Sequence, residues 1–374
     1  MSPRVLFTAS TPSHILNFHL PYLRRFRELG WEVEVACGEP VRDIPEADRV
    51  IPLPFRKKIT APGNFRAAAI LRREMRRAPY DLVITHTSLA AFFTRLALPK
   101  RGPRPAVVNM VHGYLFDLQK PGFKDRLLFR AEAMTAGRTD LVLTMNQVDF
   151  NLAREQHLGA RVEHVPGVGV DFSRLDGAPA RDRRVLRQSL GLSDCDFVLL
   201  YAAEFSKRKN QALLIRALAR LPQRVTLVLA GQGAELEGCK ALARELGVES
   251  RVRFPGQVAD LGPWDAAADA AVSSSRSEGL PFNIMEAMYA SLPIVASNVK
   301  GHSDLLVPEE SGLLYSADDP DACAQAVRRL SDDLELCKAL GQTAHQAVLH
   351  YQLDAVLPQV MDQYLSVVKV PAMV

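Results

Sequence analysis

Short apolar segments alternate with amphipathic helical segments along most of this chain, and this alternation restricts the possible folds more than any other feature. Such alternation is typical of parallel β-sheets covered by helices. The expected strands of a first series are Val5–Thr8, Glu32–Cys37, Asp81–Thr85, Ala106–Val111 and Leu141–Thr144. Those of a second series are Phe197–Tyr201, Val225–Ala230, Val252–Phe254, Ala270–Ser273 and Ile294–Ser297. The sequence therefore predicts an α/β protein with two doubly wound, Rossmann-like domains that face each other across a cleft.

The length of the chain supports this division. A single hydrophobic core rarely organises as many as 374 residues. The stretch DFSRLDGAPARDRR at 171–184 is polar and contains Gly and Pro, as linkers do. We expect one domain over 1–172, a second over 173–352, and a C-terminal segment over 353–374 that forms a helix and packs back on the first domain.

The first expected helix follows a polar loop at Ser10–Ser13. Its apolar residues recur at helical spacing, and Gly30 is expected to end it. The residues expected to point into the core are Leu20, Leu23, Phe26 and Leu29.

Composition narrows the class of protein further. A chain with 48% hydrophobic and 24% charged residues is globular. Its five cysteines are scattered without a CxxC pair, which suggests reduced thiols. No run of residues is long and apolar enough for a membrane span, and the N-terminus lacks the apolar stretch of a signal peptide. These features predict a cytoplasmic protein.

Charge is divided unevenly between the two halves. Residues 1–175 hold 26 Lys and Arg against 17 Asp and Glu, a net of +9, and the rest hold 20 against 25, a net of −5. Basic clusters of this kind attract phosphate-bearing partners. We expect an anionic membrane face rather than nucleic acid, because no aromatic residues interleave with the clusters and no nucleic-acid-binding motif is present. An ordinary solvated face is the alternative. The clusters are Arg24–Arg25, Arg56–Lys58, Arg72–Arg73, Arg76–Arg77 and Lys100–Arg101.

The stretch Ser273–Ala290 carries the strongest chemical signal. A strand ends in serines, a loop carries Glu278 and Gly279, and a helix begins near 281–283. Glycine allows close approach to a ligand, and a helix start offers free N–H groups to an anion. Glu278 and Glu286 are suited to accept hydrogen bonds from vicinal hydroxyls of a sugar or a ribose. For Glu286 the alternative is a capping box with Asn283.

Two further loops point to a phosphate-bearing ligand. Lys207, Arg208 and Lys209 precede a helix and suit a diphosphate, although a solvated basic turn has the same composition. Gly231 and Gly233 follow a strand but lack the third glycine of the dinucleotide fingerprint, so an oxidoreductase is a poor interpretation.

In the first domain, His112 follows the strand Ala106–Val111, where it is either functional or structural. Asp194 and Asp196 precede their strand and so lie at the wrong end of the sheet to bind a ligand. We expect no metal site.

Taken together, these residues resemble the retaining family-4 glycosyltransferases of the GT-B fold. The most specific match is the pair of glutamates eight residues apart, Glu278 and Glu286, within EGLPFNIMEAM. In the first half the matching segments resemble a bacterial subgroup that builds exopolysaccharide, capsule or O-antigen units on a polyprenyl-diphosphate carrier. These segments are HGYLF at 112–116, Glu132, Asp140, NQVD at 146–149 and PGVGVD at 166–171.

The resemblance implies a role for each matching residue. Glu278, Lys209 and His112 would form the catalytic group, binding the donor sugar, neutralising the leaving diphosphate and contacting the sugar near the reacting carbon. Glu286 would hold the ribose, and Ser13 and His14 would lie in the acceptor region. The remaining donor contacts would come from Lys207, Gly231, Gly233, Val258, Gly279, Leu280, Pro281 and Phe282.

The implied activity is retaining transfer of a sugar from a nucleotide-diphosphate donor, by resemblance a UDP-sugar. The acceptor would be a polyprenyl-diphosphate-linked saccharide at the inner face of the cell membrane, with neither cofactor nor metal required. One departure is Ala203-Glu204, where many members have Gly-Arg. The alternatives are another GT-B enzyme, such as a nucleotide-sugar epimerase, and a non-catalytic sugar-nucleotide-binding subunit of a polysaccharide assembly complex. Glu204 keeps the latter open.

Overall fold

The computed structural model describes residues 2–40, 43–99, 102–118, 121–176 and 180–368. It divides into two compact units, one comprising Met1–Gly169 with Asp354–Val374 and the other Val170–Leu353. The basic pair Lys100–Arg101, the middle of the expected linker (177–179) and the end of the C-terminal segment (369–374) lie outside the described residues.

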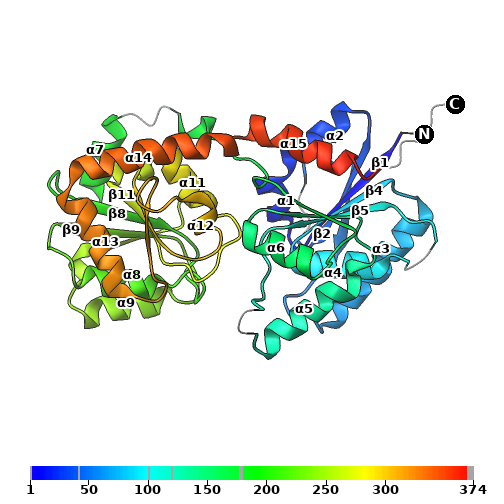
Figure 1. Ribbon diagram of the computed structural model, residues 1–374, viewed down its shortest axis with the longest axis horizontal. Helices are drawn as coiled ribbons and strands as arrows, with labels where there is room; N and C mark the ends of the chain where they lie inside the picture. The colour runs from blue at the N-terminus through cyan, green and yellow to red at the C-terminus, as the bar shows by residue number, and fades with distance from the viewer. Residues whose placement is uncertain (1, 41–42, 100–101, 119–120, 177–179, 369–374) are drawn as a thin grey trace. The chain divides into compact units, whose positions relative to one another are not determined.

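Unit 1 contains a seven-stranded sheet in the order β3-β2-β1-β4-β5-β6-β7, in which every neighbouring pair is parallel (Figure 1). Its strands are β1 Arg4–Ala9, β2 Glu32–Gly38, β3 Arg49–Leu53, β4 Leu82–His86, β5 Ala106–Val111, β6 Leu141–Thr144 and β7 Arg161–His164. Its helices are α1 Pro12–Phe18, α2 Leu20–Glu28, α3 Pro62–Arg77, α4 Ser88–Ala97, α5 Phe123–Ala136, α6 Gln147–Glu155 and α15 Leu353–Leu365.

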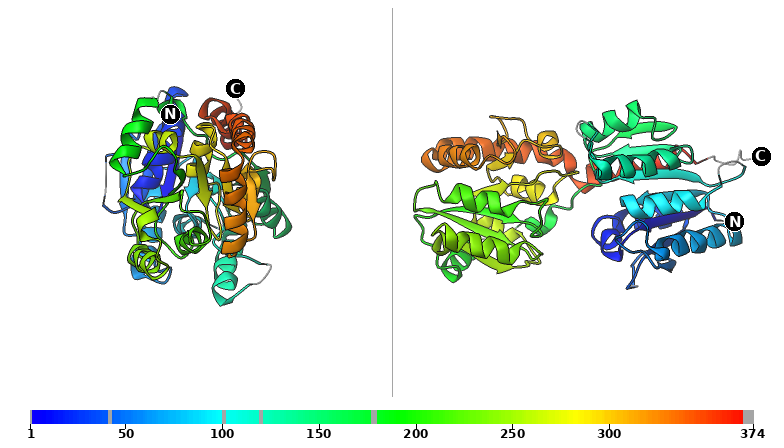
Figure 2. Two further views of the ribbon diagram at one scale, coloured as in Figure 1. Left: turned by 90° about the vertical axis from the view of Figure 1, so that its left-hand side faces the viewer. Right: turned by 90° about the horizontal axis from the view of Figure 1, so that it is seen from below.

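Unit 2 contains a six-stranded parallel sheet in the order β10-β9-β8-β11-β12-β13, with helices on both faces (Figure 2). Its strands are β8 Phe197–Ala202, β9 Val225–Ala230, β10 Val252–Gly256, β11 Ala270–Ser273, β12 Ile294–Ser297 and β13 Leu313–Tyr315. Its α-helices are α7 Ala180–Ser189, α8 Gln211–Leu218, α9 Leu236–Glu245, α10 Gly262–Ala267, α11 Phe282–Tyr289, α12 His302–Leu305, α13 Pro320–Asp332 and α14 Leu334–Val348. Single 3-10 turns lie at Ser173–Leu175, Glu249–Arg251 and Leu349–Tyr351. The α/β prediction with two Rossmann-like domains is confirmed.

In both units the strand order reverses at one point. In unit 1 the chain leaves β1 for β2 on one side and later returns to place β4 on the other, and in unit 2 β8 lies between β9 and β11 in the same way. Ligands of doubly wound sheets bind at the carboxyl ends of the strands beside such a switch point. The sequence-predicted site loops follow β8 and β11, so the fold brings them to one switch point.

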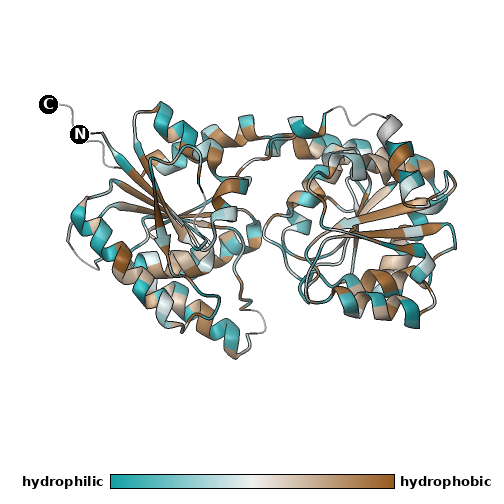
Figure 3. Ribbon diagram, turned by 180° about the vertical axis from the view of Figure 1, so that it is seen from behind, coloured by the Kyte–Doolittle hydropathy of each residue, from teal (hydrophilic) through white to brown (hydrophobic). Residues whose placement is uncertain are grey.

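The strands of both sheets consist mainly of apolar residues, and hydrophilic residues are frequent along the helices (Figure 3). In unit 1, α15 packs onto this core through Tyr364, which is fully buried. Its ring lies 5.9 Å from that of Tyr22 and 6.3 Å from that of Phe26, measured between ring centroids. Within the described residues, no helix is long and apolar enough to cross a bilayer.

Two details near the N-terminus differ from expectation. The loop expected at Ser10–Ser13 is interrupted by α1, which begins at Pro12 because proline is well suited to the first turn of a helix. Leu29, expected in the core, is 43% exposed because α2 ends at Glu28, before Leu29 can turn inward.

Candidate active site

The loop between β8 and α8 carries the cations of the predicted site, and its backbone is anchored to the neighbouring loop after β11. The Ser274 hydroxyl donates to the carbonyl oxygens of Lys209 and Asn210, at 2.9 Å each. Asn210 adopts a left-handed conformation (φ 54°), which asparagine tolerates well, and this residue directs the chain into α8. The backbone thereby fixes where Lys209 can place its ammonium group.

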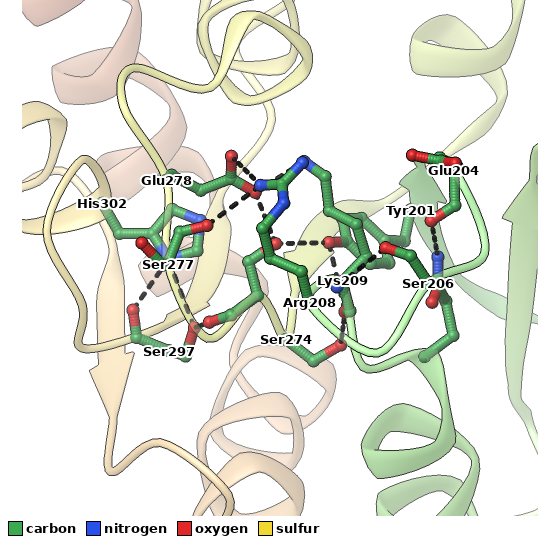
Figure 4. A network of polar contacts seen from close by, with 12 residues as sticks. Tyr201, Glu204, Ser206, Arg208, Lys209, Ser274, Ser277, Glu278, Ser297 and His302 are labelled. Carbon is green, nitrogen blue, oxygen red and sulfur yellow. Dashed lines mark hydrogen bonds and ion pairs between the residues drawn. The ribbon is translucent and has the colours of Figure 1, made fainter. Parts of the chain in front are cut away.

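Glu278 belongs to the polar network drawn in Figure 4. Its Oε1 accepts hydrogen bonds from Lys209 Nζ and from the Ser275 hydroxyl, each at 2.5 Å. Its Oε2 accepts from Arg208 Nη1 at 2.8 Å. The carboxylate is 8% exposed, so it is a nearly buried anion held between two cations.

Burial and pairing act on the titration of these groups in opposite directions. Burial raises the pKa of Glu278, but the charges of Lys209 and Arg208, with the hydrogen bonds it accepts, outweigh that effect and hold its pKa below the ordinary value. Burial lowers the pKa of Lys209, and the Glu278 carboxylate offsets only part of that change. Each group therefore depends on the other to remain charged inside the protein.

Further hydrogen bonds, which do not involve the Glu278 carboxylate itself, fix the loop that carries this residue. The Ser297 hydroxyl donates to the Ser275 carbonyl at 2.5 Å, and the Ser275 and Tyr201 hydroxyls lie 2.8 Å apart. His302, which is fully buried, lies with Nδ1 2.8 Å from the Ser297 carbonyl oxygen. These contacts tie together the ends of β8, β11 and β12.

Gly301 also positions Glu278, and sequence reasoning missed it. It has a φ of +84°, and a Cβ there would lie 2.8 Å from the Glu278 Cβ and 3.0 Å from the Gly279 carbonyl oxygen. Only glycine fits this backbone conformation and this close approach. In the sequence Gly301 is a single glycine in a loop, and no local pattern distinguishes it from other loop glycines.

A cavity of about 410 Å³ opens at the carboxyl ends of β8 and β9. Glu204, Gly231 and Val258 are among the residues that line it. A Cβ on Gly231 would lie 2.1 Å from the Ala203 carbonyl oxygen, and one on Gly233 would lie 2.2 Å from that of Phe205, so these glycines let the two loops meet. The structure thus brings Gly231 and Val258, two of the residues predicted to contact the donor, to one cavity.

Glu286 does not form the capping box that its spacing from Asn283 allowed. Helix α11 has Pro281 at its N-cap, which places Asn283 inside the helix. The Glu286 carboxylate is 5% exposed and instead pairs with Arg174. Burial raises the pKa of Glu286, with Arg174 acting against that shift.

A second buried acid lies near Glu286. Asp265 on α10 is 3% exposed, and its Oδ2 has no hydrogen-bond partner among the described residues. Burial, reinforced by the charge of Glu286, holds its pKa well above the usual range. Sequence reasoning did not single it out, because an aspartate in an unremarkable helical segment carries no signal of its burial.

The loop before α11 contains the remaining predicted donor residues. Leu280 and Pro281 are buried, whereas Gly279 and Phe282 are partly exposed. They follow Glu278 directly, so they lie at the same edge of the sheet as Lys209.

Two charged residues of the β8–α8 loop lie away from Glu278. Lys207 is exposed and lines a separate hollow with Arg276. Of the two cations that precede Lys209, it is therefore Arg208 that pairs with Glu278. Glu204 lies at the opposite end of the network from Glu278 (Figure 4), and its carbonyl oxygen accepts from the Gln211 amide at 2.9 Å.

In unit 1, the predicted residues His14 and His112 lie together at the carboxyl ends of β1 and β5. Their Nε2 atoms are 3.3 Å apart. Two histidines that sequence reasoning did not assign, His19 and His86, complete a cluster of four. Ser13 is exposed, and its hydroxyl donates to the Thr11 hydroxyl at 3.1 Å.

A cavity of about 210 Å³ adjoins this cluster, lined in part by His112, Tyr114 and Glu132. Glu132 is held by the fully buried Arg95 through two hydrogen bonds of 2.9 and 2.8 Å, so its carboxylate is already paired. Burial lowers the pKa of all four cluster histidines, to about 4 for His14. At neutral pH they are therefore uncharged.

Comparison with known proteins identifies the family. Residues 22–174 match the family described as Glycosyltransferase Family 4, and residues 182–347 match Glycosyl transferases group 1. EpsD of Bacillus subtilis (strain 168), which is named as a glycosyltransferase, is 31% identical, with 97% of each chain covered. The UDP-Gal:alpha-D-GlcNAc-diphosphoundecaprenol alpha-1,3-galactosyltransferase of Escherichia coli is 24% identical over 90% of each chain.

The fold has close structural counterparts. HepE of Anabaena, solved in complex with UDP and glucose, superposes with a TM-score of 0.81 at 22% identity, over 97% of this chain and 100% of that one. Together with the two family matches, this likeness assigns both units to the GT-B architecture. The chain belongs to the family 4 and group 1 glycosyltransferases and has the GT-B fold.

Proposed function

We propose that this glycosyltransferase moves a sugar from a UDP-sugar to a saccharide carried on a polyprenyl diphosphate, with retention of anomeric configuration. The observation that supports this most strongly is the Glu278 carboxylate held between Lys209 and Arg208 at the switch point of unit 2. The carboxylate can accept hydrogen bonds from sugar hydroxyls, and the two cations can bind a diphosphate. The site therefore matches a ligand that contains both groups. The E. coli relative, whose name specifies a UDP-sugar and a diphosphoundecaprenol-linked acceptor, supports the choice of both substrates.

Four sets of contacts hold the donor in this proposal. The nucleoside occupies the 410 Å³ cavity beside Val258 and Gly231. The Glu286 carboxylate, which pairs with Arg174 through Oε1, accepts from the ribose hydroxyls. The diphosphate lies against Lys209, Arg208 and the N–H groups that begin α11, while Glu278 accepts from the sugar hydroxyls.

The transfer step breaks the bond between the anomeric carbon and the diphosphate oxygen and forms one to the acceptor oxygen. The acceptor attacks from the face that the diphosphate leaves, and the diphosphate takes the hydroxyl proton. Lys209 and Arg208 stabilise the negative charge that builds on the leaving group, which lowers the barrier electrostatically. These two cations take the place that a diphosphate-bound Mg²⁺ would fill. Nδ1 or Nε2 of His112 contacts the sugar near the reacting carbon.

The acceptor is reached at a membrane surface through unit 1. Helix α5 exposes an apolar and basic stripe at helical spacing, formed by Phe123, Leu127, Arg130 and Met134, with Arg126 beside it. Phe123 is 86% exposed, which is unusual for so large an apolar residue. Apolar and cationic side chains on one helix face suit the interface of an anionic bilayer.

Transfer assays with UDP-, GDP- and dTDP-sugars test the proposal, using a crude polyprenyl-lipid extract as acceptor and no added Mg²⁺ or Mn²⁺. Sugar on the lipid from a UDP donor alone is the expected result. Conversion of the donor without an acceptor would indicate an epimerase, and tight donor binding without turnover would indicate a non-catalytic subunit. Full turnover by Glu286→Ala would overturn the ribose assignment.

A further inference from the structure

Four histidines from separate parts of unit 1 converge on one point. His14 lies on α1, His19 follows that helix, His86 ends β4 and His112 follows β5. One ring nitrogen from each can be chosen so that all four lie within 4.8 Å of one another. Every one of these atoms belongs to unit 1, so the cluster is complete within a single compact unit.

Hydrogen bonding alone leaves this cluster unsatisfied. His112 Nε2 lies 3.3 Å from His14 Nε2 and 3.2 Å from His86 Nδ1, but a neutral ring nitrogen carries either one proton or one lone pair. His112 Nε2 can therefore form a full hydrogen bond with only one of these two neighbouring nitrogens. Both nitrogens of His19 and Nε2 of His86 are buried without a partner among the described residues. Such orphaned groups are expensive to bury.

The separations match those between ligands of a tetrahedral metal ion. Zn–N bonds of about 2.0–2.1 Å place ligand nitrogens about 3.3–3.4 Å apart. The two short separations at His112 are close to that length, and the four chosen nitrogens all lie within 4.8 Å of one another. His14 and His112 are partly exposed, which leaves an entry path.

We propose that His14, His19, His86 and His112 bind one divalent d-block cation, best matched by Zn²⁺. Four imidazoles with no carboxylate among the ligands disfavour Mg²⁺, Ca²⁺ and Mn²⁺, which prefer oxygen ligands. All four ligands belong to unit 1, whereas the residues proposed to bind the donor diphosphate belong to unit 2. The bound cation adds positive charge beside the 210 Å³ cavity lined by His112. Because His112 Nε2 is then a ligand, only Nδ1 of that ring remains for a sugar contact.

Metal binding can be measured without any activity assay. The full chain, freed of any polyhistidine tag and stripped with a chelator, is titrated with Co²⁺ alone and then with Zn²⁺. We expect one Co²⁺ per chain with the intense visible absorption of four-coordinate cobalt, abolished by one equivalent of Zn²⁺. A weak, six-coordinate cobalt spectrum, or binding well below one equivalent, would overturn the proposal.

Variants locate the ion. His14→Gln and His86→Gln are each expected to weaken Co²⁺ binding by more than roughly 10–100-fold. A loss of roughly 10–100-fold is typical when a residue that only hydrogen-bonds to a metal ligand is removed. His157→Asn is the matched control, because His157 is exposed, lies outside the cluster and has a φ of 51° that asparagine accepts. Wild-type affinity in both cluster variants would exclude the site. If His86→Gln fails to fold, the His14→Gln variant, at a partly exposed position, and the Co²⁺ spectrum of the wild-type protein still decide the outcome.

Discussion

The Lys209 ammonium and the Glu278 carboxylate, 69 residues apart in sequence, form an ion pair of 2.5 Å between the loops that follow β8 and β11. Both side chains are nearly buried, at 12% and 8% exposure. The pair exists because β8 and β11 are neighbours in the sheet. It links the stability of unit 2 to the donor site proposed here.

Removing the Lys209 charge is expected to slow transfer strongly. Lys209→Met should lower kcat by about 100- to 1,000-fold, since loss of one pre-organised donor to a developing anion typically costs that much. Steady-state kinetics with the UDP-sugar measure the effect. Lys240→Met is the control, because Lys240 on α9 forms its ion pair with Glu237 at the surface. An undiminished kcat in Lys209→Met would rule out its role at the diphosphate.

Gly301→Ala is expected to disturb Glu278 in addition to straining the backbone. The backbone conformation of Gly301, with φ +84° and ψ −45°, alone costs an L-residue about 1–3 kcal/mol. At Gly301 the added Cβ also meets Glu278, whereas at Gly30, with a φ of +80°, it meets nothing within 4 Å. Both variants should lose unfolding free energy, but only Gly301→Ala should raise the donor KM. An equal KM in the two variants would contradict the positioning role of Gly301.

The stability supplied by Glu278 should depend on pH. Its folded-state pKa lies below the ordinary value of 4.5, so its contribution is present above that pH and is lost as the pH falls through the folded pKa. Glu278→Gln should therefore be less stable than wild type at pH 7, by up to about 3 kcal/mol, because Lys209 is left buried without its counter-ion. The difference in unfolding free energy between wild type and Glu278→Gln should become smaller at acidic pH.

Urea unfolding of wild type and of Glu278→Gln from pH 7 to pH 3 measures how their difference in unfolding free energy depends on pH. Glu309→Gln provides the control, since Glu309 also pairs with an arginine, Arg329, but lies at the surface. Exposed pairs contribute little. A gap between wild type and Glu278→Gln that stayed constant with pH would show that the carboxylate charge is not what stabilises the loop.

The stripe on α5 is expected to bind anionic vesicles. Replacing Arg126 and Arg130 together by glutamine should weaken partitioning about 30-fold at low salt, because each basic residue near an anionic surface contributes about 1 kcal/mol. Co-sedimentation with vesicles of anionic phospholipid measures it. Arg216→Gln with Arg244→Gln, on α8 and α9 of unit 2, is the matched control. A wild-type protein that stays in the supernatant would refute membrane association through this helix.

Sequence pattern located most central strands because they are continuous apolar runs. Ala106–Val111, Leu141–Thr144, Val225–Ala230, Ala270–Ser273 and Ile294–Ser297 have the predicted bounds. The three missed strands, β3, β7 and β13, all lie at sheet edges. Edge strands are short or polar, and β3 contains Pro52, which is tolerated only where no ladder bond is needed.

The site was partly predictable for a similar reason. The motif around Glu278 and the basic loop at Lys209 are local signals, and the order of parallel strands brings them together. The choice of Arg208 over Lys207, the Arg174 partner of Glu286 and the role of Gly301 depend on side-chain directions that no local pattern encodes. His14 and His112 were assigned separately from the sequence, but the cluster that they form with His19 and His86 was not predicted, because the spacing of the four histidines matches no metal-ligand motif.

The most direct test of the proposed function is transfer of radiolabelled sugar from a UDP-sugar into organic-extractable polyprenyl lipid, comparing wild type with Glu278→Gln. The proposed site predicts lipid-bound label with wild type and at least about 100-fold less with the variant, because the sugar hydroxyls lose their charged acceptor. Equal labelling by the two proteins would contradict the central role of Glu278, and no labelling by wild type with any UDP-sugar would contradict the proposed substrates.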